Sequence, residues 1–422
     1  MLFNSYIFIF LFLPLALIGY FVLNRLGRNM YAKVFLLVMS LWFYGYFNYT
    51  YLAVIISSIA VNYAVVYLMR RYPGRKKLCL AAGLVFDIGM LFYFKYFDFF
   101  LTNVNAVFNL SFTMRNIVLP LGISFFTFQQ ISYVVDAYHG ETDDESFLDY
   151  AVFVTFFPQL IAGPIVTHDE LIPQIKDESR QRPDYGNLSK GLMIFAAGMF
   201  KKVIIADTFG GIADWGFGDI AAMSSIDAFL VMFSYTMQIY FDFSAYSDMA
   251  IGIGRMFNFE LPANFNSPYK SYSIIEFWKR WHMTLTRFLT KYIYFPLGGS
   301  RKGNIRTYVN IMIVFLVSGL WHGAAWTFVL WGLWFAVLLL LEKSVLLPVL
   351  EKHRALGHVY TLFFVTLGFV LFDADSAAQA VSRIGAMFGA GGLPLLSTQA
   401  VYLLRSYGPL LVLGILCATP LP

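Results

Sequence analysis

Residues 308–341 read YVNIMIVFLVSGLWHGAAWTFVLWGLWFAVLLLL. Two strongly apolar runs, Tyr308–Leu320 and Trp326–Leu341, are separated here by a short turn that contains His322. Roughly 20 apolar residues are enough to cross the hydrocarbon core of a bilayer. Such a span must be helical, because lipid offers unpaired backbone groups no hydrogen-bond partner. The stretch therefore predicts two membrane-embedded helices with a histidine between them.

The composition of the whole chain agrees with this prediction. Hydrophobic residues make up 59% of the 422 residues and charged residues 13%, whereas about 25% of an ordinary soluble domain is charged. A water-soluble globular protein is therefore excluded. The alternating polar and apolar strands of a membrane barrel are also absent, so we predict an all-α polytopic transmembrane bundle.

Apolar runs recur from one end of the chain to the other. The candidate spans are Leu2–Leu23, Tyr31–Phe47, Tyr51–Met69, Lys77–Tyr96, Val118–Ala137, Tyr150–Ile165, Gly191–Asp207, Ile226–Phe243, Tyr308–Leu320, Trp326–Leu341, Val359–Phe372 and Tyr402–Cys417. Because some are expected to be re-entrant or interfacial, we predict ten to twelve spans. The run Tyr150–Ile165 contains two prolines and a glycine, which favours a broken helix.

The short loops predict the orientation. Basic residues follow the first span (Arg25, Arg28, Lys33) and the third span (residues 70–77), while the second loop, Asn48–Thr50, has none. Cytoplasmic loops are the ones rich in Lys and Arg, so the amino terminus is predicted outside the cytoplasm. By the same reasoning Asp98–Asn116 is expected to be an outer loop. The first run has its charges after it, the reverse of a cleaved signal peptide, and is expected to be a retained helix.

The segment Arg255–Arg306 is the most basic part of the chain. It contains nine Lys or Arg against two acids, together with many aromatic residues. This composition predicts short interfacial or re-entrant helices on the cytoplasmic side. The net charge of +5 fits topology and contact with lipid headgroups, and no nucleic-acid partner is expected.

One domain spanning residues 1–422 is predicted, because no long polar linker and no internal repeat is apparent. The two cysteines, Cys79 and Cys417, have no metal-ligand spacing, so no metal ion is expected. GxSxG, HExxH, P-loop and dinucleotide-binding motifs are also missing. Hydrolase, metalloprotease and nucleotide-motor functions therefore lack support.

His322 is the first candidate for chemistry. An ionisable group at membrane depth costs several kcal/mol unless it faces a cavity or a partner, so it is a functional hypothesis by default. The alternative is a neutral histidine that is hydrogen-bonded between helices. Asp242 and Asp248 are close together at another span and would suit a proton relay, or equally would cap helices or bind a basic neighbour.

His282 is the second candidate. On a continuous helix through Glu276–Arg287, its neighbours Phe277, Trp278, Trp281 and Leu285 fall on one face, with His282 at the edge of that face. The alternative is an interfacial histidine packed under tryptophans. Histidine suits acyl transfer, because a pKa near 6.5 lets it take a proton from a hydroxyl nucleophile and return it to the leaving group.

Several motifs together resemble the membrane-bound O-acyltransferase family, in particular its alginate O-acetyltransferase branch of bacterial polysaccharide acetylases. They cover about residues 120–335. The motifs are Gly122–Gln130 (GISFFTFQQ), Phe157–Pro164 (FPQLIAGP), Tyr240–Asp248 (YFDFSAYSD), Asn264–Tyr269 (NFNSPY), Phe277–His282 (FWKRWH), Tyr294–Gly299 (YFPLGG) and Ser318–Gly323 (SGLWHG).

The resemblance implies a helical bundle with a central funnel or tunnel. A donor, expected to be acetyl-CoA, is used from the cytoplasmic side, and an acceptor at or beyond the membrane receives the acyl group. By its motif, His322 resembles the catalytic histidine of the family, and His282 its second position. Lys and Arg of the basic segment are expected to attract the donor phosphates. The expected donor-binding residues are Trp278, Lys279, Arg280, Trp281 and Arg287.

The resemblance further implies a multi-pass protein of the bacterial inner membrane that O-acetylates an alginate-like exopolymer, cellulose or peptidoglycan. It also implies a separate, exported SGNH esterase-like partner. D-alanyl transfer to teichoic acid, known in a sister branch, is an alternative acyl transfer. A proton-coupled transporter or flippase that uses the same histidines, and a structural scaffold, are the alternatives from other classes.

Overall fold

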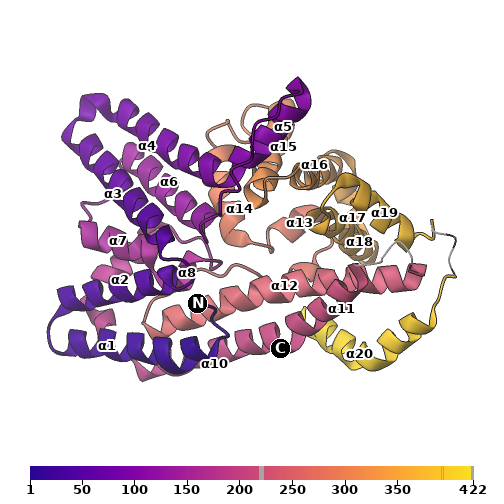
Figure 1. Ribbon diagram of the computed structural model, residues 1–422, viewed down its shortest axis with the longest axis horizontal. Helices are drawn as coiled ribbons and strands as arrows, with labels where there is room; N and C mark the ends of the chain where they lie inside the picture. The colour runs from indigo at the N-terminus through magenta and orange to yellow at the C-terminus, as the bar shows by residue number, and fades with distance from the viewer. Residues whose placement is uncertain (218–222, 391, 393, 420–422) are drawn as a thin grey trace. The chain divides into compact units, whose positions relative to one another are not determined.

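The computed structural model describes residues 1–217, 223–390, 392 and 394–419. These residues form helices joined by turns, and no strand occurs among them. The chain divides into two compact units, one of residues 1–198 and 246–263, the other of residues 199–245 and 264–422 (Figure 1). The all-α prediction is confirmed, while the single domain stays a prediction.

The first unit contains the amino-terminal helices. They are α1 (Leu13–Arg25, after a π-helical turn at Phe8–Phe12), α2 (Asn29–Gly45), α3 (Thr50–Arg71), α4 (Lys76–Leu91), α5 (Phe97–Phe108), α6 (Ile123–His139), α7 (Phe147–Thr155), α8 (Phe157–Leu160), α9 (His168–Lys176), most of α10 (Tyr185–Phe200) and the end of α12 (Ser225–Met256). Gly83 of α4 lies against the side chains of Val65 in α3 and Val134 in α6. These three helices therefore pack closely (Figure 1).

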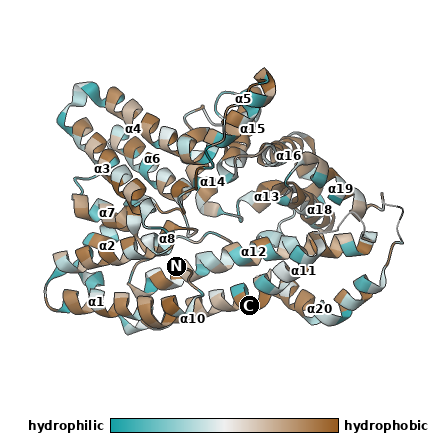
Figure 2. Cartoon of the chain, in the orientation of Figure 1, coloured by the Kyte–Doolittle hydropathy of each residue, from teal (hydrophilic) through white to brown (hydrophobic). Residues whose placement is uncertain are grey.

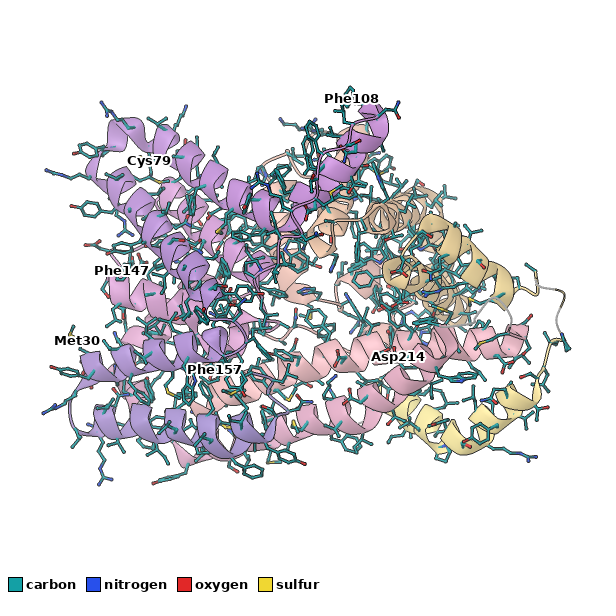
Figure 3. All side chains as sticks on the ribbon, in the orientation of Figure 1. Met30, Cys79, Phe108, Phe147, Phe157 and Asp214 are labelled. Carbon is teal, nitrogen blue, oxygen red and sulfur yellow. The ribbon has the colours of Figure 1, made fainter. Side chains whose placement is uncertain are left out.

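Two predictions from the sequence can be compared with the helices of the first unit. The helix is broken between α7 and α8 at Phe156, and Phe157, labelled in Figure 3, begins α8. The break in the run Tyr150–Ile165 is thus confirmed. The outer loop predicted over Asp98–Asn116 is wrong for its first half, since residues 98–108 are helical. The apolar residues of this stretch continue the helix to Phe108, and the left-handed Asn109 is its C-cap.

The second unit contains the remaining helices. They are α11 (Asp207–Phe217), the first part of α12, α13 (Ile274–Trp278), α14 (Met283–Leu289), α15 (Asn304–His322), α16 (Trp326–Leu341), α17 (Leu347–Lys352), α18 (Arg354–Asp373), α19 (Ala377–Met387) and α20 (Thr398–Cys417). Its core is aromatic, with Trp278, Trp281, Trp331, Phe335 and Phe369 all buried. The short α13 and α14 confirm that the basic segment folds as short helices.

The two runs quoted from residues 308–341 form a hairpin of α15 and α16. Gly319 lies so close to α16 that an added Cβ would be 2.3 Å from the carbonyl oxygen of Phe328. Gly332 approaches α15 in the same way, since its added Cβ would be 2.4 Å from the carbonyl oxygen of Phe315. These glycines let the two backbones meet, as small residues do between membrane helices.

Seven helices within the described residues are long and apolar enough to cross a membrane. They are Phe8–Arg25, Thr50–Arg71, Pro73–Phe108, Asn304–His322, Trp326–Lys352, Arg354–Asp373 and Thr398–Cys417. Some of the other predicted runs form shorter helices, such as α2 and α6 with 17 residues each, while Ile226–Phe243 is part of the 32-residue α12. Figure 2 shows mainly apolar residues along the helices and hydrophilic residues at the turn between α3 and α4. A polytopic helical membrane protein results.

Candidate active site

His282 lies at the junction of α13 and α14. It is the N-cap of α14 and has a backbone φ of 45°, so the continuous helix expected through Glu276–Arg287 is wrong. The aromatic face expected there still forms, because Phe277, Trp278, Trp281 and Leu285 are all buried. A positive φ is uncommon for a residue with a side chain. Such an outlier, over-determined by its surroundings, is a reason to suspect function.

The imidazole of His282 is held by Asn264. Nδ1 of His282 lies 3.1 Å from Oδ1 of Asn264, and the same oxygen accepts a hydrogen bond of 2.9 Å from the hydroxyl of Thr284. His282 is 1% exposed and Asn264 also 1%. Within the described residues, Nε2 of His282 has no hydrogen-bond partner.

Burial controls the charge of His282. Removal of the ring from water lowers the pKa of His282 well below its usual value, and the nearby His322 lowers it further. Desolvation disfavours the charged form of any buried base. His282 is therefore a neutral imidazole at physiological pH, with one nitrogen able to accept a proton.

His322 is the last residue of α15 and is half-buried. Its ring centroid lies 4.9 Å from that of Trp331 in α16 and 5.2 Å from that of Phe372 in α18, both in edge contacts. Gly323 follows in an extended conformation and ends the helix. The hairpin and α18 thus build an aromatic wall around His322.

Trp321 brings the two histidines into one site. Its ring lies 5.9 Å from the His282 ring and 4.9 Å from the His322 ring, measured between centroids. Phe243 of α12 covers His282 in an edge contact at 4.8 Å. His282, His322, Trp321 and Asn264 are called the histidine site below. Sequence motifs predicted both histidines, and the structure places them together.

A cavity of about 270 Å³ lies between α13, α14, α15 and α16. Its lining is mostly apolar but includes Lys279 and Lys343, and we call it the lysine pocket. Trp278 and Ser318 also line it, each four residues before a histidine of the site. Ser318 and His322 therefore share one side of α15, as residues four apart do.

Glu342 fixes α13 beside the carboxyl end of α16. Its buried carboxylate accepts hydrogen bonds of 2.6 and 2.9 Å from the backbone amides of Ile274 and Ile275. Lys343, the next residue, lines the lysine pocket together with Lys279. Lys343 was missed by sequence reasoning, and the only signal for it was a charged pair directly after the run Trp326–Leu341.

The five predicted donor-binding residues are divided by the structure. Trp278 and Lys279 line the lysine pocket. Trp281 is 4% exposed and packs in the aromatic core, stacked on Phe277. Arg280 is paired with Glu276 at 2.7 Å, while Arg287 is exposed on α14. Only two of the five therefore line one cavity.

Three other ionisable residues, Asp242, His358 and His168, have partners of their own. Asp242 is paired with Lys202 at 2.6 Å, which supports the interpretation of a carboxylate bound to a basic neighbour. His358 is half-buried in α18, where its Nδ1 lies 3.3 Å from the carbonyl oxygen of Ser271. His168 is buried in α9, with Nε2 3.1 Å from Oδ2 of Asp136.

The model of the membrane-bound O-acyltransferase family matches residues 36–371. The chain belongs to this family. It is 43% identical to the peptidoglycan O-acetyltransferase of Helicobacter pylori, over 94% of this chain and 81% of that protein. It is 38% identical to the probable alginate O-acetylase AlgI of Pseudomonas putida, over 93% of this chain and 81% of that protein.

A more distant relative belongs to another branch. The teichoic acid D-alanyltransferase of Bacillus subtilis is 28% identical over 61% of this chain and 70% of that protein. Membership of the family makes the chain an O-acyltransferase, an enzyme that uses an acyl donor. Together with its apolar helices, the family identifies a multi-pass bacterial membrane protein.

Proposed function

We propose that this O-acyltransferase moves acetyl groups from cytoplasmic acetyl-CoA to hydroxyl groups of a cell-envelope polysaccharide outside the membrane. We infer the class of acceptor from the names of two relatives, one a peptidoglycan O-acetyltransferase and the other a probable alginate O-acetylase. The observation that carries the proposal is the meeting of His282 and His322 at Trp321. A neutral histidine beside a second histidine is suited to moving the proton that O-acylation must remove from a hydroxyl.

In the proposed reaction His322 is the general base. The acceptor oxygen attacks the carbonyl carbon of the acetyl thioester, a C–O bond forms, and the C–S bond breaks. The hydroxyl proton passes to His322 and then to the departing sulfur, which leaves as a thiol. His282 assists this proton transfer. No further reactant is needed, because the proton lost by the hydroxyl is the one gained by the thiolate.

The lysine pocket is the proposed entrance for the donor. Its apolar lining from Trp278, Phe315 and Leu339 suits the uncharged arm of a thioester, while Lys279 and Lys343 suit phosphates. Arg280, which is paired with Glu276, and Arg287 of α14 add to the basic character of this segment. Trp281 does not line the pocket but packs in the aromatic core, where it is stacked on Phe277. Trp278 and Ser318 line the pocket, and each lies four residues before one of the two histidines.

Further parts of the proposal concern the surroundings of the enzyme. We expect a separate exported esterase-like protein of the SGNH type to complete acetylation of the polymer. The amino terminus lies outside the cytoplasm, since basic residues follow the first and third spans. D-alanyl transfer to teichoic acid is the second candidate reaction, supported by the likeness to the D-alanyltransferase of Bacillus subtilis.

Replacement of His322 tests the proposed chemistry. His322→Ala should lower acetyl transfer by at least about a hundredfold, the lower end of what a general base contributes. The control is His353→Ala, which changes an exposed histidine between α17 and α18. Both variants should insert into membranes at the wild-type level. Acetylation of the polymer by His322→Ala at the rate of the control would refute His322 as the base.

A further inference from the structure

Asn264 makes contacts that determine which nitrogen of His282 carries a proton. Oδ1 of Asn264 faces Nδ1 of His282 at 3.1 Å and the backbone nitrogen of Thr284 at 3.3 Å. A backbone N–H can only donate, so the Asn264 atom at this position is an oxygen. Nδ1 of His282 must then donate as well. The neutral ring consequently carries its hydrogen on Nδ1 and a lone pair on Nε2.

Backbone pairing prevents Asn264 and His282 from separating. The amide of Met283 donates to the carbonyl oxygen of Asn264 at 2.9 Å, and the amide of Asn266 donates to the carbonyl oxygen of Arg280 at 2.9 Å. These two bonds join the segments on either side of the side-chain contact. The left-handed backbone of His282, held between them, then aims the ring at Asn264.

We propose that Asn264 is a positioning residue that keeps Nε2 of His282 unprotonated, so that Nε2 can assist His322 by sharing the proton that His322 takes up. This inference rests on the proposed function and adds to it the atom that assists His322. The proton that His322 takes from the acceptor hydroxyl is shared with Nε2 of His282 while Nδ1–H stays bonded to Asn264. It returns through His322 to the departing sulfur, so His282 ends the cycle in the tautomer in which it began.

The tautomer can be observed without any acyl transfer. Protein labelled with carbon-13 and nitrogen-15 in its six histidines, reconstituted in lipid, gives ring chemical shifts that separate the two neutral forms. The His282→Asn sample identifies the signal of His282 by its loss. We expect the Nδ1–H form in the wild type and a loss of that form in Asn264→Ala. An Nε2–H form in the wild type, or an unchanged signal in Asn264→Ala, overturns the inference.

Activity as a function of pH separates positioning from a merely structural role. Asn264→Ala should lower kcat by about a hundredfold or more, as expected for loss of a proton-transfer partner, with little change in the KM for the donor. Asn264→Asp keeps an oxygen acceptor and should restore most of kcat. Its negative charge raises the pKa of His282, so the acidic limb of its pH profile should move to higher pH.

The matched control is Asn266→Ala, because Asn266 lies two residues away with an exposed side chain, and wild-type kcat is expected. Equal losses of kcat in Asn264→Ala and Asn264→Asp, with no shift of the pH profile, would overturn the positioning role. A His322→Ala enzyme that retains activity would refute the proposed base instead, and would leave the measured tautomer of His282 unchanged.

Discussion

His282 and His322 come to Trp321 from different parts of the second unit, one before α14 and the other at the end of α15. Only His282 is fully buried, and it is the one that Asn264 orients. The two residues are therefore not equivalent. Nδ1 of His282 is hydrogen-bonded to Asn264. Burial lowers the pKa of His282, so the ring stays neutral at pH values where a free histidine would be protonated.

At the lysine pocket, single residues should control donor affinity. Lys343→Ala and Lys279→Ala should each raise the KM for acetyl-CoA about two- to fivefold, the size of a partly solvated charge contact, with kcat nearly unchanged. Salt should reduce the difference from wild type. The control is Lys352→Ala, an exposed lysine of α17 outside the pocket. An equal KM for acetyl-CoA in all three variants would show that the lysine pocket does not bind the donor.

The sequence predicts the two histidines because each lies in a family motif, but it does not predict how they are supported. Asn264 belongs to another motif, and its bond to Nδ1 of His282 depends on backbone pairing between distant segments. Lys343 lines the same pocket as Lys279, and the adjacent Glu342 accepts hydrogen bonds from the first two amides of α13. Trp281 and Arg280 have suitable chemistry for a donor site, yet packing and an ion pair engage them elsewhere.

Among the elements, the α15–α16 hairpin positions His322. Gly319 lies three residues before His322, and an added Cβ would be 2.3 Å from the carbonyl oxygen of Phe328. Gly319→Ala should therefore separate the helices, lower the free energy of unfolding by roughly 1–3 kcal/mol as overpacking does, and reduce acetyl transfer. Thermal unfolding in detergent and the rate of transfer measure the two effects.

Gly211→Ala in α11 is the control for this hairpin variant, since an added Cβ there meets nothing within 4 Å. It should be neutral or slightly stabilising, because alanine favours a helix over glycine by about 1 kcal/mol. Wild-type stability and activity in Gly319→Ala would contradict the role given to the hairpin. The sequence predicts both helices of this hairpin from their hydropathy, whereas the glycine contacts appear only in the structure.

Helix existence is better predicted than helix continuity. Apolar runs predict α15, α16 and α18 well, because hydropathy alone decides whether a segment enters a bilayer. The segment Glu276–Arg287 has helical periodicity, yet it breaks at His282. There the His282 ring contacts Asn264, and the Met283 amide donates to the Asn264 carbonyl oxygen in place of a carbonyl one helical turn earlier. Local pattern does not reveal such tertiary contacts.

For the whole molecule, the central claim is that an acetyl group given on the cytoplasmic side reaches a polysaccharide on the other side. The basic residues between α3 and α4 are the reason why we propose the cytoplasm as the donor side. We further propose that the two lysines of the lysine pocket attract the donor phosphates. The exported partner is expected to finish the reaction on the opposite side. Family membership supports the acyl transfer itself, whereas the direction of transfer has to be measured with the protein inserted in a membrane.

The most direct test uses oriented proteoliposomes that contain the purified protein. Acetyl-CoA with a radioactive acetyl group is supplied only on the side of the α3–α4 turn, and the polysaccharide with the exported partner only on the other side. We predict acetylated polymer with wild-type protein and with His353→Ala, and none above background with His322→Ala. Polymer labelled equally by His322→Ala, or labelled only when donor and acceptor share one side, would contradict the account.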